Sequence, residues 1–111
     1  MADRLTHEPL TTPEHLLTVT TAGVTDDYAR LRCVGEIDQA TAPLFAAALA
    51  EAVPGRHRVE ADLAEVSFMD SSGINALVQH RVPGCDLVVT NVPPHIRRVF
   101  DITGLTPILC A

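Results

Sequence analysis

Strand-like and helix-like patterns alternate along most of this chain, and that order strongly limits the folds open to it. Strands are predicted at 16–21, 28–34 and 56–63, and a β-branched run at 85–92 is typical of a strand covered on both faces. Helices are predicted from Thr41, as the cap, to about Val53, then at 71–82 and 93–104, before a short strand at 106–110. The predicted order is β-β-α-β-α-β-α-β.

Strand–helix–strand units in series favour parallel pairing with right-handed crossovers. The sequence therefore predicts a single α/β domain at 15–111, with a mixed, mostly parallel sheet of about four to five strands. Residues 1–14 are polar and contain Pro9 and Pro13, so a flexible N-terminal leader is expected there.

Composition narrows the functional classes. The 111 residues suffice for one domain, and 47% hydrophobic but only 4% aromatic residues predict an aliphatic core. The net charge is -6 and lysine is absent, which disfavours binding to nucleic acid or to an anionic membrane. Neither an apolar run of membrane-spanning length nor a signal-peptide pattern is present, so we expect a cytoplasmic protein.

The usual motifs of catalysis and cofactor binding are missing from the sequence. Cys33, Cys85 and Cys110 are odd in number and widely spaced, which argues against a disulfide framework or a thiolate metal site. Cys33 and Cys85 are expected to be buried in strands. The histidines lack ligand-like spacing, and no phosphate-binding glycine loop or G-x-S-x-G motif occurs. We expect no enzyme activity, no cofactor and no metal.

The stretch "SFMDSSGIN" at 67–75 passes abruptly from a strand pattern to a helix pattern. Asp70 and the serines that follow it are good helix caps, because their oxygens accept unpaired N–H groups of the first turn. Two serines in tandem are more than one cap requires. Gly73 leaves room for another part of the backbone to approach. The residues alone leave two interpretations open, a cap and a site of chemical modification.

Three stretches of the sequence together resemble a known family. "GEIDQATAP", "VEADLAEVSFMDSSGINAL" and "VVTNVPPHIRRVFDITGL" are similar to the signature stretches of STAS domains, in the same order and from about residue 16 onward. Stand-alone bacterial anti-sigma factor antagonists (anti-anti-sigma factors) are the most similar members. The resemblance implies an unmodified protein that binds an anti-sigma factor and thereby releases a sigma factor.

The resemblance also implies a switch and the residues around it. Ser71 would be phosphorylated by the anti-sigma factor, a serine kinase that supplies ATP and Mg²⁺, and a metal-dependent protein serine phosphatase would reverse the reaction. Asp70, Ser72 and Gly73 complete the motif around this serine. Asp38 lies in the "GEID" loop that adjoins the serine in the family fold, and Asn91 matches the polar residue ending the fourth strand. The free protein is expected to be a monomer.

Two features leave the function open to other interpretations. The helix at 71–82 is shorter than family members usually have, which bears on the choice of partner. STAS modules also act as regulatory or scaffolding domains that bind a protein or a small ligand without a phosphorylation switch. A nucleotide-binding module is a weaker alternative, because lysine and a glycine-rich loop are absent.

Overall fold

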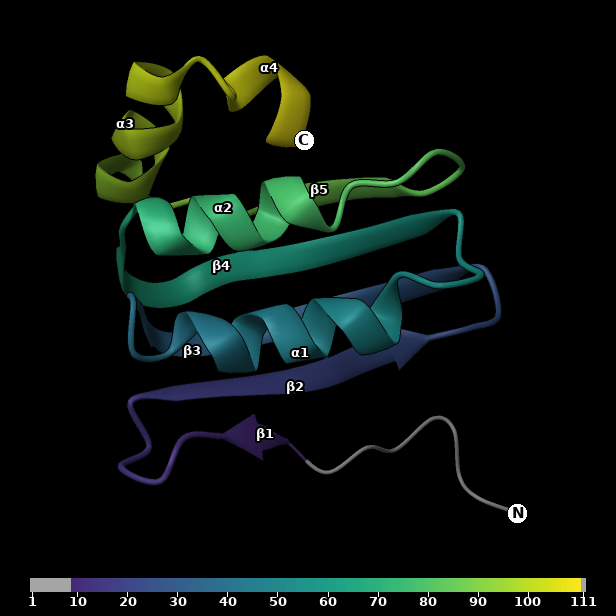
Figure 1. Cartoon of the computed structure of the whole chain (residues 1–111), viewed down its shortest axis with the longest axis horizontal. Helices are drawn as coiled ribbons and strands as arrows, with labels where there is room; N and C mark the ends of the chain where they lie inside the picture. Colours follow the sequence, from purple (N-terminus) through teal and green to yellow (C-terminus); the bar gives the residue numbers. More distant parts are fainter. Residues whose placement is uncertain (1–8, 111) are drawn as a thin grey trace.

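A five-stranded mixed sheet and four helices make up the described part of the protein (Figure 1). The computed structural model describes residues 9–110. In chain order the elements are β1 (Leu10–Thr11), β2 (Leu17–Val24), β3 (Tyr28–Ile37), α1 (Ala42–Ala52), β4 (Arg58–Met69), α2 (Ser71–Gln79), β5 (Asp86–Thr90), α3 (Pro94–Thr103) and α4 (Thr106–Leu109). The sheet order is β1-β2-β3-β4-β5. β1, β2 and β3 pair antiparallel, whereas β3, β4 and β5 pair parallel. The predicted α/β class with a mixed sheet is confirmed.

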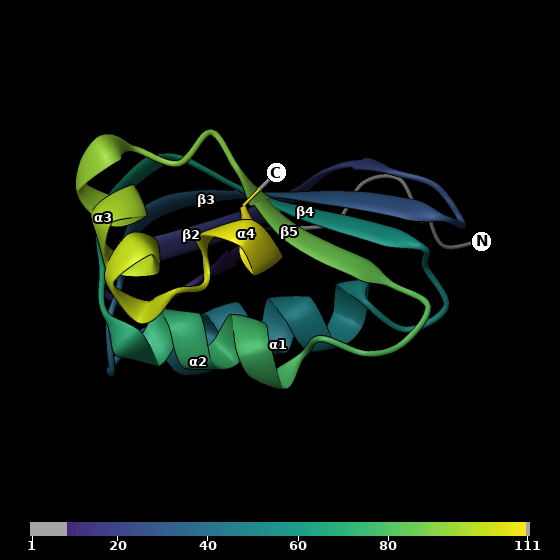
Figure 2. The ribbon, with the colours of Figure 1, turned by 90° about the horizontal axis from the view of Figure 1, so that it is seen from above.

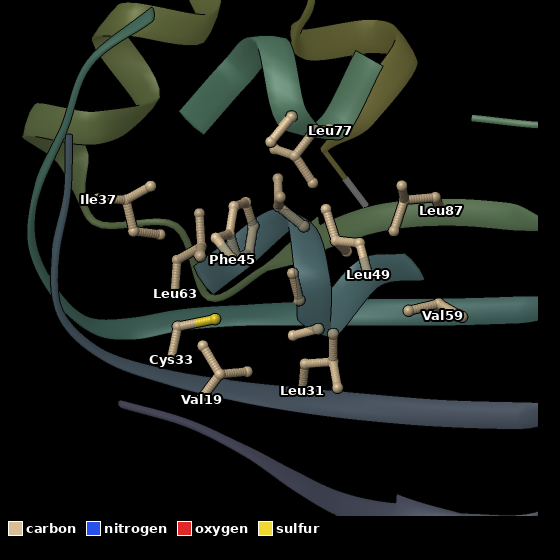
Figure 3. Close-up of a cluster of buried hydrophobic side chains, with 14 of the residues drawn as sticks. Val19, Leu31, Cys33, Ile37, Phe45, Leu49, Val59, Leu63, Leu77 and Leu87 are labelled. Atoms are coloured by element: carbon tan, nitrogen blue, oxygen red, sulfur yellow. The ribbon is translucent and has the colours of Figure 1, made fainter. Parts of the chain in front are cut away.

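Helices α1 and α2 lie side by side on one face of the sheet, and the aliphatic core fills the space between the two layers (Figure 2). β3 has the predicted alternation, with Leu31 and Cys33 buried and Arg32 exposed on the opposite side. Side chains from strands and helices meet in this core, as Figure 3 shows for Val19, Leu31, Cys33, Ile37, Phe45, Leu49, Val59, Leu63, Leu77 and Leu87.

The other face of β3 and β4 carries ion pairs. They join Arg30 to Asp62, Arg32 to Glu65, and Arg58 to Glu60. Because alternate residues of a strand point to opposite faces, an apolar face toward the helices leaves the charged residues on this side. Asp62 is nevertheless buried, at 5% exposure, which makes it the unusual member of the set.

The prediction of a last strand at 106–110 is wrong. Residues Thr106–Leu109 form the short helix α4, and only Cys110 makes an isolated bridge to Val89 at the outer edge of β5. Pro107 lies in the first turn of α4, where its missing N–H costs nothing. The same residue would weaken a strand by removing a ladder donor.

The two edges of the sheet also differ from expectation. Leu10 and Thr11, within the expected leader, form β1 and pair with Val19 and Thr18. Residues 1–8 of that leader lie outside the described residues. β5 is predicted to be covered on both faces, yet buried and more exposed residues alternate along it, and Cys85 beside it is only partly buried. β5 is also an edge strand of the sheet. A β-branched run does not by itself distinguish a central strand from an edge strand.

Helices α2 and α3 begin where the sequence predicts. α3 ends at Thr103, and Gly104 closes it in a left-handed conformation with φ 74°. α2 ends at Gln79, earlier than the predicted residue 82, and the chain then turns around Pro83 and Gly84 through a bridge between Val82 and Cys85. The second helix is therefore even shorter than the sequence suggested.

Candidate functional site

The carboxyl ends of β3 and β4 form the edge at which the predicted residues gather. Ile37 of β3 is in register with Met69 of β4, and the Asp70 N–H donates to the Ile37 carbonyl oxygen at 3.2 Å. Asp38 and Asp70 are the residues that follow this pair on adjacent parallel strands. The structure thus brings the two predicted acids to one edge, where α2 starts (Figure 1).

Asp70 is the cap of α2. Its backbone is extended, and its Oδ1 accepts the Ser72 N–H at 2.8 Å. Its carbonyl oxygen accepts the Gly73 N–H at 3.1 Å and begins the helical hydrogen bonds. A carboxylate here also interacts favourably with the helix dipole. Because Asp70 performs the capping, neither serine is needed for it.

Ser71 is the first residue of α2 and its side chain is exposed. Its hydroxyl makes no hydrogen bond to another described residue, whereas Ser72 is half-buried. Ser71, Asn75 and Val78 follow one another along the outer side of α2, at the i, i+4 and i+7 spacing of a single helix face. These residues line an open depression together with Ser72 and Ile74. The Ser71 hydroxyl is therefore accessible to another protein.

Gly73 allows α2 to lie close to the strand ends. A Cβ at this position would be 2.7 Å from Cγ2 of Ile37 and 3.0 Å from Cγ of Met69. The close neighbours are thus buried side chains rather than the second backbone segment that the sequence analysis suggested. Gly73 sets how near the start of α2, with Ser71, approaches the sheet.

The loop after β3 is held together by Asp38 and Thr41. The Asp38 Oδ1 accepts the N–H groups of Ala40 and Thr41, each at 3.0 Å. The Thr41 hydroxyl donates to the Glu36 carbonyl oxygen at 2.7 Å and accepts the Asp38 N–H at 2.9 Å. Thr41 occupies the N-cap position of α1 as predicted, but its side chain makes no capping hydrogen bond. This role of Thr41 in holding the loop is not evident from its position in the sequence.

Asn91 lies apart from the other predicted residues. It follows Thr90, the last residue of β5, which is in register with Asp62 in the middle of β4. β4 continues from there to Met69 before it reaches Asp70. Asn91 is exposed, and its backbone is in the left-handed region at φ 53°. The short length of β5 is the reason that this strand end does not reach the Ser71 edge.

Asp62 is the polar residue whose importance the sequence analysis missed. Burial disfavours its charged form, but hydrogen bonds from the Ala64 N–H, the Asn91 side chain and Arg30 outweigh this, so the pKa of Asp62 lies below its ordinary 3.8. The carboxylate binds Arg30 of the neighbouring strand β3 and the Ala64 N–H of its own strand. The sequence does hold a sign of this role, because Asp62 lies between the apolar residues Ala61 and Leu63 of a predicted strand.

Within residues 9–110, no three histidine, cysteine or acidic side chains are grouped so that they could hold a metal ion. The described cysteines are all unpaired. No helix in this part of the chain is both long and apolar enough to cross a membrane.

Comparison with known proteins identifies the family. Residues 20–109 match the family model described as "Mlab, STAS domain". The chain therefore belongs to the STAS domain family. The anti-sigma-B factor antagonist of Staphylococcus epidermidis is 35% identical over 92 residues, which cover 76% of this chain and 82% of that protein.

Solved structures agree with this assignment. An anti-sigma factor antagonist from Mycobacterium paratuberculosis superposes with a TM-score of 0.75 at 26% identity, covering 90% of this chain and 87% of the other. The anti-sigma factor antagonist SpoIIAA, in its unphosphorylated form, gives a TM-score of 0.69 at 26% identity, covering 82% and 84% of the two chains. Its phosphorylated form, from Bacillus, gives 0.62 at 26% identity, covering 82% and 87%. These relatives are anti-sigma factor antagonists, which is a regulatory role.

Proposed function

We propose that this protein is an anti-sigma factor antagonist that phosphorylation of Ser71 switches off. The unmodified protein binds an anti-sigma factor with serine kinase activity and so releases a sigma factor. One observation carries the proposal: Asp70 caps α2, which leaves the Ser71 hydroxyl exposed and without a structural hydrogen bond among the described residues.

The surface beside Ser71 suits contact with a protein. Val78 and Val82 are 44% and 47% exposed, and Val78 lies on the same side of α2 as Ser71. Exposed apolar side chains next to a polar group are common in the cores of protein interfaces. Asp38 and Asp70 flank the serine at the ends of neighbouring strands and would contact the partner there. Asn91, exposed at the end of β5, would contact the partner only if the interface extends beyond this edge.

A phosphate on Ser71 changes the electrostatics of this edge. The group adds about -1.5 to -2 charges near neutral pH. Like charges about 4 Å apart repel by about 1 kcal/mol in water and by about 4 kcal/mol at an effective dielectric constant of about 20. The Ser72 N–H, a natural phosphate ligand at a helix start, is already bound by Asp70. At the exposed helix start water screens the repulsion between the phosphate and Asp70, so the fold tolerates it. Docking would bury the phosphate against the partner together with the acids of this edge, and that desolvation weakens binding.

The proposal includes the enzymes that act on Ser71. The anti-sigma factor supplies ATP and Mg²⁺ for the transfer, and a metal-dependent protein serine phosphatase removes the phosphate. Support comes from a relative of similar fold, SpoIIAA, whose structure exists in both phosphorylated and unphosphorylated forms. We place the protein in the cytoplasm, as a monomer when free.

The test is to incubate the protein with ATP and each purified serine-kinase anti-sigma factor of its source organism. Intact mass and peptide mapping then locate the phosphate in wild type, Ser71→Ala and Ser72→Ala. We expect one phosphate in wild type and Ser72→Ala, and none in Ser71→Ala. Phosphate on Ser71→Ala would contradict the proposed site. Tight binding without any phosphate transfer would instead support a scaffolding module without a switch.

Affinity provides the second measurement. Phosphorylated protein is expected to bind the anti-sigma factor roughly a hundredfold more weakly, since each 1.4 kcal/mol corresponds to about tenfold. Ser71→Asp should reproduce part of the loss, and Ser71→Ala should bind like the unmodified protein. Calorimetry on matched samples measures both. Equal affinity of the phosphorylated and unmodified proteins would refute the switch.

A further inference from the structure

Thr41 is a buried polar residue whose hydroxyl does not serve the helix that it precedes. It is 1% exposed, and its Oγ1 makes no capping hydrogen bond to α1. The hydroxyl instead donates to the carbonyl oxygen of Glu36 at 2.7 Å and accepts the N–H of Asp38 at 2.9 Å. Its hydrogen bonds therefore fasten the loop between β3 and α1 to the end of β3.

The same loop orients the carboxylate of Asp38. Its Oδ1 accepts two backbone N–H groups, from Ala40 and Thr41. No other described residue hydrogen-bonds to its Oδ2. One oxygen is thus fixed to the loop while the other is available to a group from outside. The orientation of this available oxygen depends on the loop, and the loop depends on the Thr41 hydroxyl.

We infer that Thr41 is a positioning residue for partner binding, which holds the Asp38 carboxylate in the orientation that the anti-sigma factor contacts. The inference rests on the proposed function, because it concerns the same docking edge. Asp38 follows Ile37, whose carbonyl oxygen is bonded to the Asp70 N–H, so the loop adjoins the start of α2. A disordered Asp38 would lose binding free energy to the ordering of its side chain and loop.

Three substitutions separate this role from a general effect on folding. Thr41→Val keeps the shape but leaves the Glu36 carbonyl oxygen and the Asp38 N–H without their partner. Thr41→Ser retains the hydroxyl and serves as the matched control. Asp38→Ala removes the group through which Thr41 is inferred to act. The double variant Asp38→Ala/Thr41→Val closes a thermodynamic cycle.

The probe is the serine-kinase anti-sigma factor that binds the wild-type chain in the screen described above. Thr41→Val and Asp38→Ala are each expected to weaken binding by about tenfold, and the double variant no more than about twofold beyond Asp38→Ala. Thr41→Ser should stay within about threefold of wild type. Thermal melts will show a loss of stability for Thr41→Val in both backgrounds, so affinity and stability are read separately.

Several outcomes would overturn the inference without touching the proposed function. One is a Thr41→Val effect on affinity that is as large in the Asp38→Ala background as in wild type. Another is wild-type affinity in either single variant while Ser71→Asp still weakens binding. If no serine-kinase anti-sigma factor binds the wild-type chain, the proposed function itself fails.

A measurement without the partner completes the test. The inference requires the amide hydrogens of Asp38 and Thr41 to exchange faster in Thr41→Val than in Thr41→Ser, while those of β4 remain protected. Equal protection of the loop in the two variants would overturn it.

Discussion

Gly73 gives the most direct test of how α2 is held against the sheet. In Gly73→Ala the new Cβ would lie 2.7 Å from Ile37 Cγ2 and 3.0 Å from Met69 Cγ. Ile37 is fully buried and Met69 is 3% exposed, so neither side chain can move into solvent. Overpacking of this kind costs about 1–3 kcal/mol, and the better helix propensity of alanine returns up to about 1 kcal/mol. Because Gly73 lies in the first turn, only part of that gain applies.

We therefore expect Gly73→Ala to lower the free energy of unfolding by about 1–2 kcal/mol and Tm by about 4–8 °C. Urea titration and thermal melts measure these quantities. Asn75→Ala is the matched control, because Asn75 is an exposed position of the same helix and should gain about 0.5 kcal/mol from propensity alone. A Gly73→Ala protein as stable as wild type would refute the packing argument.

A compensating substitution makes the test stricter. Ile37→Ala removes the Cγ2 that the new methyl group would meet, at a cost of about 2–5 kcal/mol for the cavity. In the double variant the methyl group enters space that Ile37 has vacated. Its loss of stability should be smaller than the sum of the two single losses by about 1 kcal/mol. Strict additivity would indicate that Gly73 and Ile37 are not in contact.

Three further predictions concern the Asp62 carboxylate, the Cys33 thiol and the phosphate on Ser71. The folded-state pKa of Asp62 is lowered, so its contribution to stability is present above its ordinary pKa of 3.8 and is lost as pH falls below it. Asp62→Ala should thus lose about 2 kcal/mol at pH 7 and show a weaker dependence on acid, in urea titrations at pH 7 and pH 3. Burial raises the pKa of the Cys33 thiol to about 12, so a thiol reagent at pH 7.5 should modify Cys85 and Cys110 long before Cys33, as peptide mapping would show. Phosphorylation of Ser71 should change the free energy of unfolding by at most about 1 kcal/mol, and a larger loss in thermal melts would mean that it acts by unfolding the domain.

Local patterns in the sequence located most elements of the fold. The switch from apolar alternation to "DSSG" placed the boundary between β4 and α2 at Asp70. Gly104 marked the end of α3, and the alternation in β3 assigned its two faces correctly. These features depend on residues within a few positions of one another, because caps, turns and strand faces are set by local backbone geometry.

The same local patterns could not decide which residue does what at the site. Both the aspartate and the serines could cap α2, and only the placed side chains show that Asp70 does so. Thr41 stands where a cap belongs, yet its hydroxyl bonds to Glu36 at the end of the preceding strand. Competing hydrogen-bond partners of similar strength differ only in distance and angle, which the order of residues does not give.

The sequence by itself determined that this chain forms an α/β domain with Asp70, Ser71 and Gly73 at the start of a helix, because those choices follow from short-range periodicity and capping. Tertiary structure alone decided that Asp38 lies beside this helix start while Asn91 does not. It also decided that 106–109 form a helix against β5, and that Asp62 is buried in a network. These outcomes depend on strand register and length, and register is set by contacts between residues distant in the chain.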